Sequence, residues 1–364
     1  MVIYNTHFLE IGQIMYNVYQ HWDPLKVMAV GKSYPPELYD YIKNEKVRKV
    51  FYKIAEETEE DYQKLISLLG TFGVETVRPN MDQSVITAKN HIEKNLTIPR
   101  PYEMQPRDYT IMLGETFYCS GDSLSNKPLT SLVKQQGNKV KFPMDSGFKH
   151  QNNSIKLNAA MTSRIGKDLI IGTVDDNEIN LSNINDLQKD LQSKLPNYRV
   201  KMMDTQGHTD GTFCPVVPGL ILSMIGPTSY TESFPGWEVV YLEGESWYKI
   251  KNFLDLKRKN YGKWWVPGEE LNDDFTNYVE SWMNHWVGYV EESVFDLNMI
   301  VIDKKNVIVN GYNEKAFDAL NRYGITPHIC NFRHRYFWDG GLHCITSDLH
   351  REGVMEDYFP ERNQ

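Results

Sequence analysis

The chain has 364 residues, of which 41% are hydrophobic and 24% charged, a composition typical of globular proteins with a sizeable core. A formal net charge of −9 argues against nucleic-acid binding, because phosphate-binding surfaces carry a basic stripe, and it favours small cationic substrates. Four cysteines without Cys-x-x-Cys spacing predict neither a disulfide framework nor a zinc ribbon.

The N-terminal segment lacks the basic region and the apolar run of a secretory signal. No stretch approaches the roughly 20 apolar residues that a membrane helix needs. We therefore expect a cytoplasmic protein in a reducing compartment, with neither a membrane nor a nucleic acid as partner.

A weak internal repeat runs along the chain. In each copy a glycine or a Pro-Asn turn, typical of a helix end, is followed by a short run with β-branched residues that predicts a strand. The five copies cover residues 73–77, 137–140, 197–200, 236–240 and 324–329. Apolar runs that predict further strands lie at residues 27–30, 109–113, 169–171, 220–222 and 299–302.

Helical segments lie between several of these strands. Residues 47–69 and 314–323 are examples, and both fit strand–helix–strand units. Repeated units of this kind favour an α/β array closed around an axis, and an ordinary α/β sheet with similar helix caps is the alternative.

An aromatic and acidic segment, residues 243–293, separates the fourth copy from the fifth. It contains five tryptophans, and we interpret it as an insert or lid, or else as a small satellite core. Because no linker rich in Ser, Gly or Pro interrupts the chain, we predict one domain over residues 1–364.

The segment 338–346, with the sequence WDGGLHCIT, places a cysteine shortly after a double glycine. Glycines let a backbone approach a ligand closely, and a cysteine in a polar loop beside a histidine can have a lowered pKa and act as a nucleophile. Cys344 is therefore a candidate nucleophile, although most cysteines are simply small buried hydrophobic residues.

A second segment, GHTDGTF at 207–213, follows a predicted strand that ends near Asp204. In a strand His208 and Asp210 would share one face, whereas the preceding Gln-Gly indicates a turn. A histidine moves protons near neutral pH and a carboxylate binds cations, which makes both residues site candidates.

A third segment, QPRDY at 105–109, places Asp108 at the start of a predicted strand. A guanidinium group is planar and always charged, so a site for it needs planar carboxylate acceptors, preferably two. Asp108 and Asp210 are the candidates, and a salt bridge with Arg107 or a turn cap is the alternative for Asp108.

Together these motifs resemble the amidinotransferases of the pentein superfamily, typified by arginine:glycine amidinotransferase and its relatives in aminocyclitol and cyanotoxin synthesis. The resemblance runs from about residue 105 to 353, and the motif around the cysteine is its most specific part. The matching segments are PRD at 106–108, NAA and RxGKD within 158–168, HxDxTF at 208–213, PG at 218–219, and GGLHCxT at 340–346 with Asp348 and Gly353.

The resemblance implies a pentein fold, a five-bladed α/β propeller of ββαβ units around a central active-site pit. It implies that a cysteine thiolate attacks the guanidino carbon of arginine and that an amine acceptor then takes the amidino group. The roles it implies are Cys344 as nucleophile, His208 as general acid/base, Asp108 and Asp210 as the amidino clamp, and Gly341 and His343 as further substrate-binding residues. Neither a metal nor an organic cofactor is expected.

Three positions depart from the family pattern. Asn158 stands where relatives have an aspartate that orients the catalytic histidine, and an asparagine can still accept a hydrogen bond from an imidazole. Pro227 and Glu292 fall near positions that hold the amino-acid end of the donor in glycine-using enzymes. The donor's amino-acid end is therefore an open question.

Two other functions remain as alternatives. A guanidino hydrolase resembling arginine deiminase would resolve the same intermediate with water, and a pentein that had lost catalysis would act as a binding module. The sequence does not select the amine acceptor, and a homodimer is a further expectation.

Overall fold

We describe the fold from a computed structural model of the chain. The structure describes residues 14–96, 98–99, 101–119, 124–141, 159–173, 181–205, 208–224, 230–242, 266–282 and 296–363.

Short strands in these described residues form five separate three-stranded sheets. In each sheet the middle strand pairs antiparallel with one neighbour and parallel with the other. With the middle strand second, the sheets are β15 (Thr346–Arg351), β1 (Leu25–Val30) and β2 (Glu75–Val77); β3 (Thr110–Leu113), β4 (Thr116–Cys119) and β5 (Lys139–Lys141); β6 (Thr162–Ile165), β7 (Asp168–Thr173) and β8 (Arg199–Asp204); β9 (Phe213–Val217), β10 (Leu220–Ser223) and β11 (Glu238–Tyr241); β12 (Ile300–Asp303), β13 (Asn306–Val309) and β14 (Thr326–Ile329).

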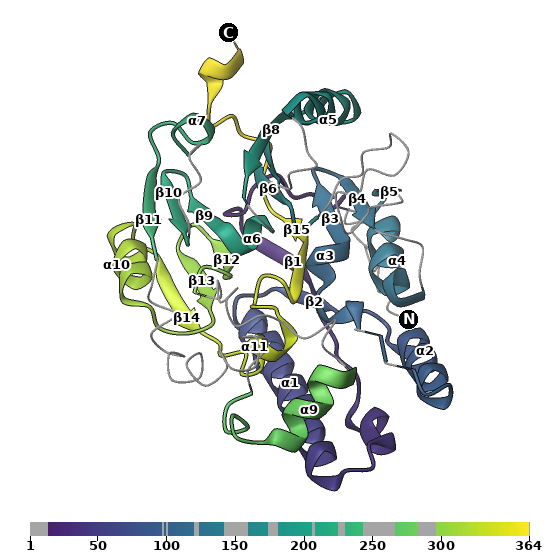
Figure 1. The fold of residues 1–364 in the computed structure, drawn as a ribbon. Helices are drawn as coiled ribbons and strands as arrows, with labels where there is room; N and C mark the ends of the chain where they lie inside the picture. Colours follow the sequence, from purple (N-terminus) through teal and green to yellow (C-terminus); the bar gives the residue numbers. More distant parts are fainter. Residues whose placement is uncertain are drawn as a thin grey trace, which may run out of the picture.

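A helix connects the two parallel strands of each sheet, so the modules have the order strand, strand, helix, strand. These helices are α1 (Glu45–Thr71), α4 (Lys127–Gln135), α5 (Leu181–Lys194), α7 (Tyr230–Ser233) and α10 (Glu314–Arg322). The first module takes its antiparallel strand, β15, from the end of the chain, which closes the array. Figure 1 shows the sheets arranged around a central region where β1 and β15 lie.

The repeat predicted from the sequence corresponds to these modules. Each of its five turn-and-strand copies overlaps one of the outer parallel strands β2, β5, β8, β11 and β14. Gly73 and Gly324 have φ of 72° and 69°, the left-handed conformation expected where a helix ends. The closed array is therefore confirmed, and the alternative of one ordinary α/β sheet is wrong.

The longest described helix, α1, shows how the sequence specifies one module. It begins where the Asn44 side chain accepts hydrogen bonds from the N–H groups of Lys46 and Val47. Its apolar face, which includes the buried Phe51 and Leu65, packs in the same hydrophobic cluster as strand β1. Burial of this face stabilises the helix on its sheet.

The described part of the predicted insert, residues 266–282, contains α9 (Asp273–Trp282). Phe275 of α9 is buried, and its ring centroid lies 5.3 Å from that of Phe51 in α1. This part therefore packs into the cluster that holds α1. Residues 243–265 and 283–295 lie outside the described residues, and the lid remains a prediction.

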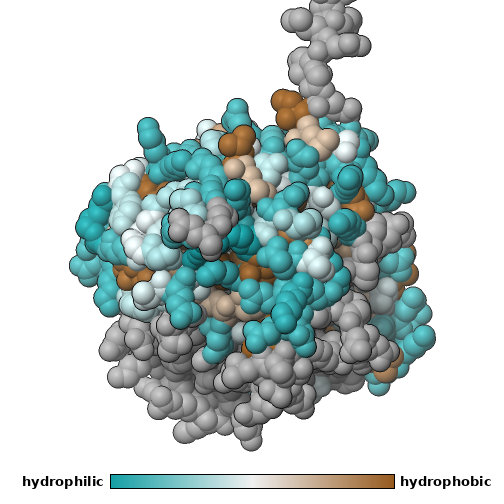
Figure 2. Space-filling view, turned by 90° about the horizontal axis from the view of Figure 1, so that it is seen from above, coloured by the Kyte–Doolittle hydropathy of each residue, from teal (hydrophilic) through white to brown (hydrophobic). Residues whose placement is uncertain are grey.

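The face seen in Figure 2 is mostly hydrophilic over its described residues, with hydrophobic side chains as separate spots. Such scattered exposure is ordinary for a globular surface. Of the helices that the structure describes, none is long and apolar enough to cross a membrane.

The centre of the fold holds a buried carboxylate that three arginines share. Asp348 of β15 accepts hydrogen bonds from Arg107, from Arg164 at 2.8 Å and from Arg351 at 2.7 Å. Burial opposes the ionisation of Asp348, but the arginines outweigh this effect and hold its pKa well below the usual range. The cluster joins α3 (Pro106–Tyr109), β6 and β15.

We expect Asp348→Asn to lower the free energy of unfolding by about 3–5 kcal/mol, because it leaves buried guanidinium groups without their counterion. Since the folded-state pKa is lowered, the wild-type contribution is present above the unfolded pKa of about 4 and is lost as the pH falls toward the folded pKa. Urea unfolding at pH 7 measures the effect. Glu352→Gln, which breaks the exposed pair with Lys26, is the control and should leave the transition unchanged.

Candidate active site

Three segments far apart in the sequence meet at the centre of the fold. Asp108 lies in α3 (Pro106–Tyr109), Asp210 lies in α6 (Thr209–Thr212), and Cys344 lies in the turn before β15. Figure 1 places α3, α6 and β15 in the central region of the ring of sheets. The fold therefore brings together residues that the sequence separates by more than 200 positions.

His208 and Asp210 do not continue strand β8, because β8 ends at Asp204 and residues Thr209–Thr212 form α6. His208 is the N-cap residue of α6, and its side chain is 46% exposed. Asp210, two residues further along the chain, is buried. The two side chains therefore differ in exposure, with the imidazole open to solvent and the carboxylate inside.

The thiol of Cys344 faces the buried carboxylate. Its Sγ atom lies 3.4 Å from Oδ2 of Asp210, in donor geometry. Nδ1 of His343 lies 2.9 Å from the same oxygen, and this nitrogen must donate because a carboxylate only accepts. The other oxygen of Asp210, Oδ1, is buried and has no hydrogen-bond partner among the residues that the structure describes.

Asp210 is a carboxylate at neutral pH. Burial favours its neutral form, but the hydrogen bond from His343, and then electrostatic interactions with His343, His208 and Arg107, lower its pKa to about 2. The pKa of His343 is itself lowered, chiefly by burial and then by Arg107. A neutral His343 therefore orients a charged Asp210.

The pKa of Cys344 is raised well above its usual value by burial and then by the charges of Asp210 and Asp108. Hydrogen bonds from Asn298 and from the Gly341 backbone act in the opposite direction but are weaker. The sequence predicted a lowered pKa for this thiol. That prediction is wrong for the protein without a bound substrate, because its own groups raise the pKa. A thiolate here needs a cation beside the two carboxylates.

Asp108 and His208 form the more open side of the site. Nδ1 of His208 lies 4.0 Å from Oδ1 of Asp108, close enough for an ion pair when the imidazole is protonated. Asp108 also acts electrostatically on Cys344. Arg107, the alternative partner of Asp108, forms an ion pair with Asp348.

The structure adds supporting contacts that the motifs did not predict. Gln105 donates to the backbone oxygen of Asp339 at 2.6 Å, and Arg107 donates to that of Thr346 at 3.0 Å. These two bonds fasten the Asp108 segment to both ends of the cysteine loop. Asn298, just before β12, contacts the backbone and the sulfur of Cys344. The sequence carries no local signal for these contacts, since each joins residues distant along the chain.

Gly341 lies three residues before Cys344 in the chain. A Cβ atom at this position would come within 2.5 Å of Oδ1 of Asn298, which explains the need for glycine. Asn158, Pro227 and Glu292 lie outside the described residues, so their predicted positions remain predictions.

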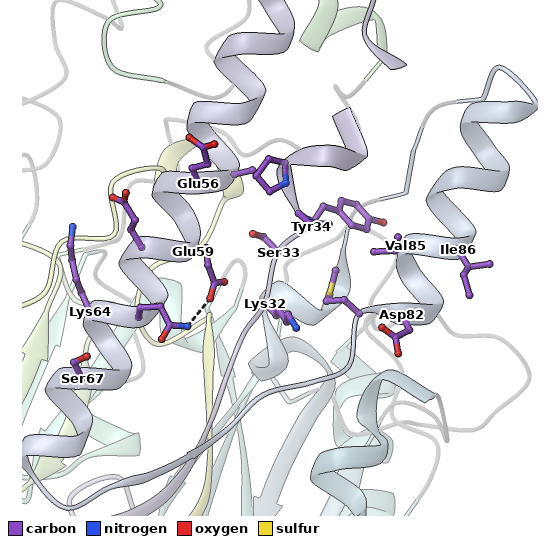
Figure 3. A pocket seen from close by; sticks show the side chains of 16 residues that line it. Lys32, Ser33, Tyr34, Glu56, Glu59, Lys64, Ser67, Asp82, Val85 and Ile86 are labelled. Atoms are coloured by element: carbon purple, nitrogen blue, oxygen red, sulfur yellow. Dashed lines mark hydrogen bonds between the residues drawn. The ribbon is translucent and has the colours of Figure 1, made fainter. Parts of the chain in front are cut away.

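A large pocket, of about 1270 Å³, lies elsewhere. Figure 3 shows it between α1, α2 (Asp82–Glu93) and the segment 32–36, with Glu56, Glu59 and Asp82 among its side chains. It shares no residue with the cysteine cluster. A small cavity of about 20 Å³ is lined by Asp210 and His343 among others, with room for about one water molecule. No group of three potential metal ligands occurs in the described parts of the chain.

The sequence is similar to those of amidinotransferases. The chain is 26% identical over 208 residues to L-arginine:L-lysine amidinotransferase of Pseudomonas savastanoi pv. phaseolicola, which covers 56% of the chain and 46% of that protein. It is 26% identical over 171 residues to mitochondrial glycine amidinotransferase of Gallus gallus, covering 45% and 32%. The chain thus matches less than half the length of these relatives. No protein-family model matches it.

Solved structures resemble nearly the whole chain. The amidinotransferase SxtG of Microseira wollei, from the saxitoxin biosynthetic pathway, has a TM-score of 0.61 and 19% identity, and the match covers 94% of this chain and 99% of that one. Inosamine-phosphate amidinotransferase StrB1 of Streptomyces griseus has a TM-score of 0.63 and 19% identity, covering 95% and 99%.

The closed array of ββαβ modules, with a cysteine and carboxylates at its centre, is therefore a pentein fold, as the sequence predicted. The chain resembles the amidinotransferases both in sequence and in fold.

Proposed function

We propose that the protein is an amidinotransferase that moves an amidino group from arginine, or a related guanidino compound, to an amine through a covalent intermediate on Cys344. One observation carries the proposal. The Cys344 thiol lies 3.4 Å from Asp210, a buried carboxylate whose second oxygen has no hydrogen-bond partner among the described residues. A guanidinium group offers the planar N–H donors that such an oxygen requires, and it brings its carbon toward the sulfur.

The first chemical step forms the bond from Sγ of Cys344 to the guanidino carbon and breaks the bond from that carbon to the donor's amine nitrogen. The thiol proton passes by way of His208 to the departing amine, and the amidino group stays on sulfur as a cation. In the second step the acceptor amine attacks the same carbon, the carbon–sulfur bond breaks, and the acceptor's proton returns to the thiolate through His208. Atoms and charge balance over both steps, with no oxidant or metal required.

The carboxylates have two effects on this chemistry. Without a cation they hold the thiol neutral, because Asp210 and Asp108 both raise the pKa of Cys344. A bound guanidinium pairs with the same carboxylates and offsets their effect on the pKa of Cys344. The thiolate of Cys344 therefore forms when the substrate is bound beside it. The exposed imidazole of His208 suits an acid/base group that must serve both a leaving and an entering amine.

Incubation with arginine and a panel of amines tests the function. Transfer predicts ornithine and an amidino-amine together, and only when an acceptor is present. Citrulline with ammonia would instead identify a guanidino hydrolase. No product from any donor, together with a Cys344 that guanidino ligands do not protect from alkylation, would support the binding module.

Asn158 is proposed to orient His208 by accepting a hydrogen bond from its imidazole. We expect Asn158→Ala to lower turnover by roughly 10-fold or more, because the imidazole loses the partner that fixes its orientation. Steady-state kinetics of Asn158→Ala and Asn158→Asp measure the effect. Unchanged turnover in both variants would contradict this role.

Two further proposals concern the whole protein. The expected cytoplasmic location can be checked by cell fractionation, and the expected homodimer by light scattering of the purified chain. The acceptor amine is left to the product panel, since the residues expected to select it, within 243–293, are largely outside the described residues.

A further inference from the structure

Asn298 is almost completely buried, at 1% exposure, and lies where the chain enters β12. Its carbonyl oxygen accepts hydrogen bonds from the backbone N–H groups of His343 at 2.8 Å and Cys344 at 3.2 Å. Its amide nitrogen donates to the backbone oxygen of Asp210 at 3.1 Å and to Sγ of Cys344 at 3.1 Å. One side chain thus contacts the turn before β15, the α6 turn and the nucleophile itself.

The orientation of this amide is fixed by its partners. An asparagine side chain offers one oxygen that accepts two hydrogen bonds and one nitrogen that donates two. The N–H groups of His343 and Cys344 can only donate, so Oδ1 must face them. Nδ2 must therefore face the sulfur, and all four capacities of the side chain are used.

We propose that Asn298 is a positioning residue of the nucleophile, which holds the Cys344 sulfur against Asp210 and donates a hydrogen bond that favours the thiolate. The role rests on the proposed function of Cys344, since it concerns the same sulfur. A donor aimed at sulfur stabilises the charged form relative to the thiol. It thereby limits the opposing effect of the two carboxylates without adding a charge that would repel a cationic substrate.

Gly341 makes this arrangement possible. A Cβ atom there would lie 2.5 Å from Oδ1 and 3.0 Å from Cβ of Asn298, so a side chain would push the amide away. The absence of a side chain at Gly341 and the amide of Asn298 therefore act together on the cysteine loop. The second glycine of the double-glycine motif is therefore needed to leave room for the Asn298 side chain.

The ionisable groups around the sulfur come from several elements. Asp210 of α6 and Asp108 of α3 oppose the thiolate, while His343 in the same turn pairs with Asp210. His208 and Arg107 act on this cluster through Asp210. Any change at Asn298 must be separated from changes in these groups, so the test uses an uncharged and a charged substitution.

The test is alkylation of Cys344 by iodoacetamide between pH 6 and 10, in roughly half-unit steps that resolve a titration, followed on the Cys344 peptide by mass spectrometry. At a fixed pH below the midpoint we expect Asn298→Ala to react roughly 10-fold more slowly than wild type, because the sulfur loses its donor. Asn298→Asp keeps the size and the acceptor oxygen but places a carboxylate beside sulfur, and it should react more slowly still. For the donor substrate, kcat should fall more than KM rises, because the lost bond is to sulfur.

Asn138→Ala is the matched control. Asn138 is also buried. Its Oδ1 accepts a hydrogen bond from the backbone N–H of Tyr16, and its Nδ2 donates to the backbone oxygens of Tyr16 and Glu115. None of these hydrogen bonds involves Cys344. It should lose stability without changing the alkylation profile. A wild-type profile in Asn298→Ala and Asn298→Asp, or an equal shift in Asn138→Ala, would overturn the proposal. Because alkylation needs no substrate, this outcome is independent of whether the chain transfers amidino groups.

Discussion

Cys344→Ser is expected to lower amidino transfer by on the order of 10⁴-fold or more, because a serine hydroxyl in the same place ionises far less readily than a thiol. The loss should be in kcat, since Asp108 and Asp210 still hold the guanidinium group. Steady-state kinetics with the donor and acceptor found in the product panel measure the effect. Donor binding by Cys344→Ser, followed by calorimetry, should stay within a few-fold of wild type.

Cys330→Ser is the control for this experiment. Cys330 is also buried, and burial raises its pKa to about 11, but it lies at the end of β14, away from the site. The variant should keep wild-type turnover. If Cys344→Ser retained turnover close to that of Cys330→Ser, Cys344 would not be the nucleophile.

Asp210→Asn is expected to change two reactions of the same thiol in opposite directions. Loss of the carboxylate charge should lower kcat/KM for the guanidino donor by about 10²–10³-fold, as when a buried charge pair loses one partner. The same loss lowers the pKa of Cys344, because Asp210 raises it after burial does. Alkylation by neutral 2-chloroacetamide below the midpoint should therefore be faster in Asp210→Asn than in wild type.

A cationic reagent of the same shape completes the comparison. 2-Chloroacetamidine should label wild-type Cys344 faster than 2-chloroacetamide does, and this preference should shrink in Asp210→Asn. Asp186→Asn removes one negative charge from the surface of α5 and is the control, because its exposed pair with Lys189 is far from the thiol's contacts. An unchanged preference in Asp210→Asn would mean that Asp210 does not bind the amidino group.

Much of the fold could be predicted from the sequence because its signals are local. The capping glycines, the β-branched runs after them and the apolar runs before them are each encoded within a few residues. Their recurrence predicted the closed array that the five sheets confirm. The packing of α9 on α1 could not be predicted, since tryptophan and acidic content does not distinguish a lid from a core segment.

Part of the candidate site could also be predicted because its motifs are local in the sequence. Cys344, His208, Asp108 and Asp210 lie in recognisable motifs, and the structure brings them to the centre of the fold. The raised pKa of Cys344 depends on burial and on carboxylates from two other segments, which no motif encodes. Asn298 and Gln105 act through contacts across 40 or more residues, so only the folded chain reveals them.

The most direct test of the account is the mass of Cys344 during turnover. The protein is mixed with arginine in the absence of any acceptor, quenched in acid, and its peptides are analysed by mass spectrometry. The account predicts one amidino group on the Cys344 peptide, formed together with one equivalent of ornithine and removed when an amine is added. Donor cleavage with no amidino group on Cys344, and with turnover preserved in Cys344→Ser, would contradict it.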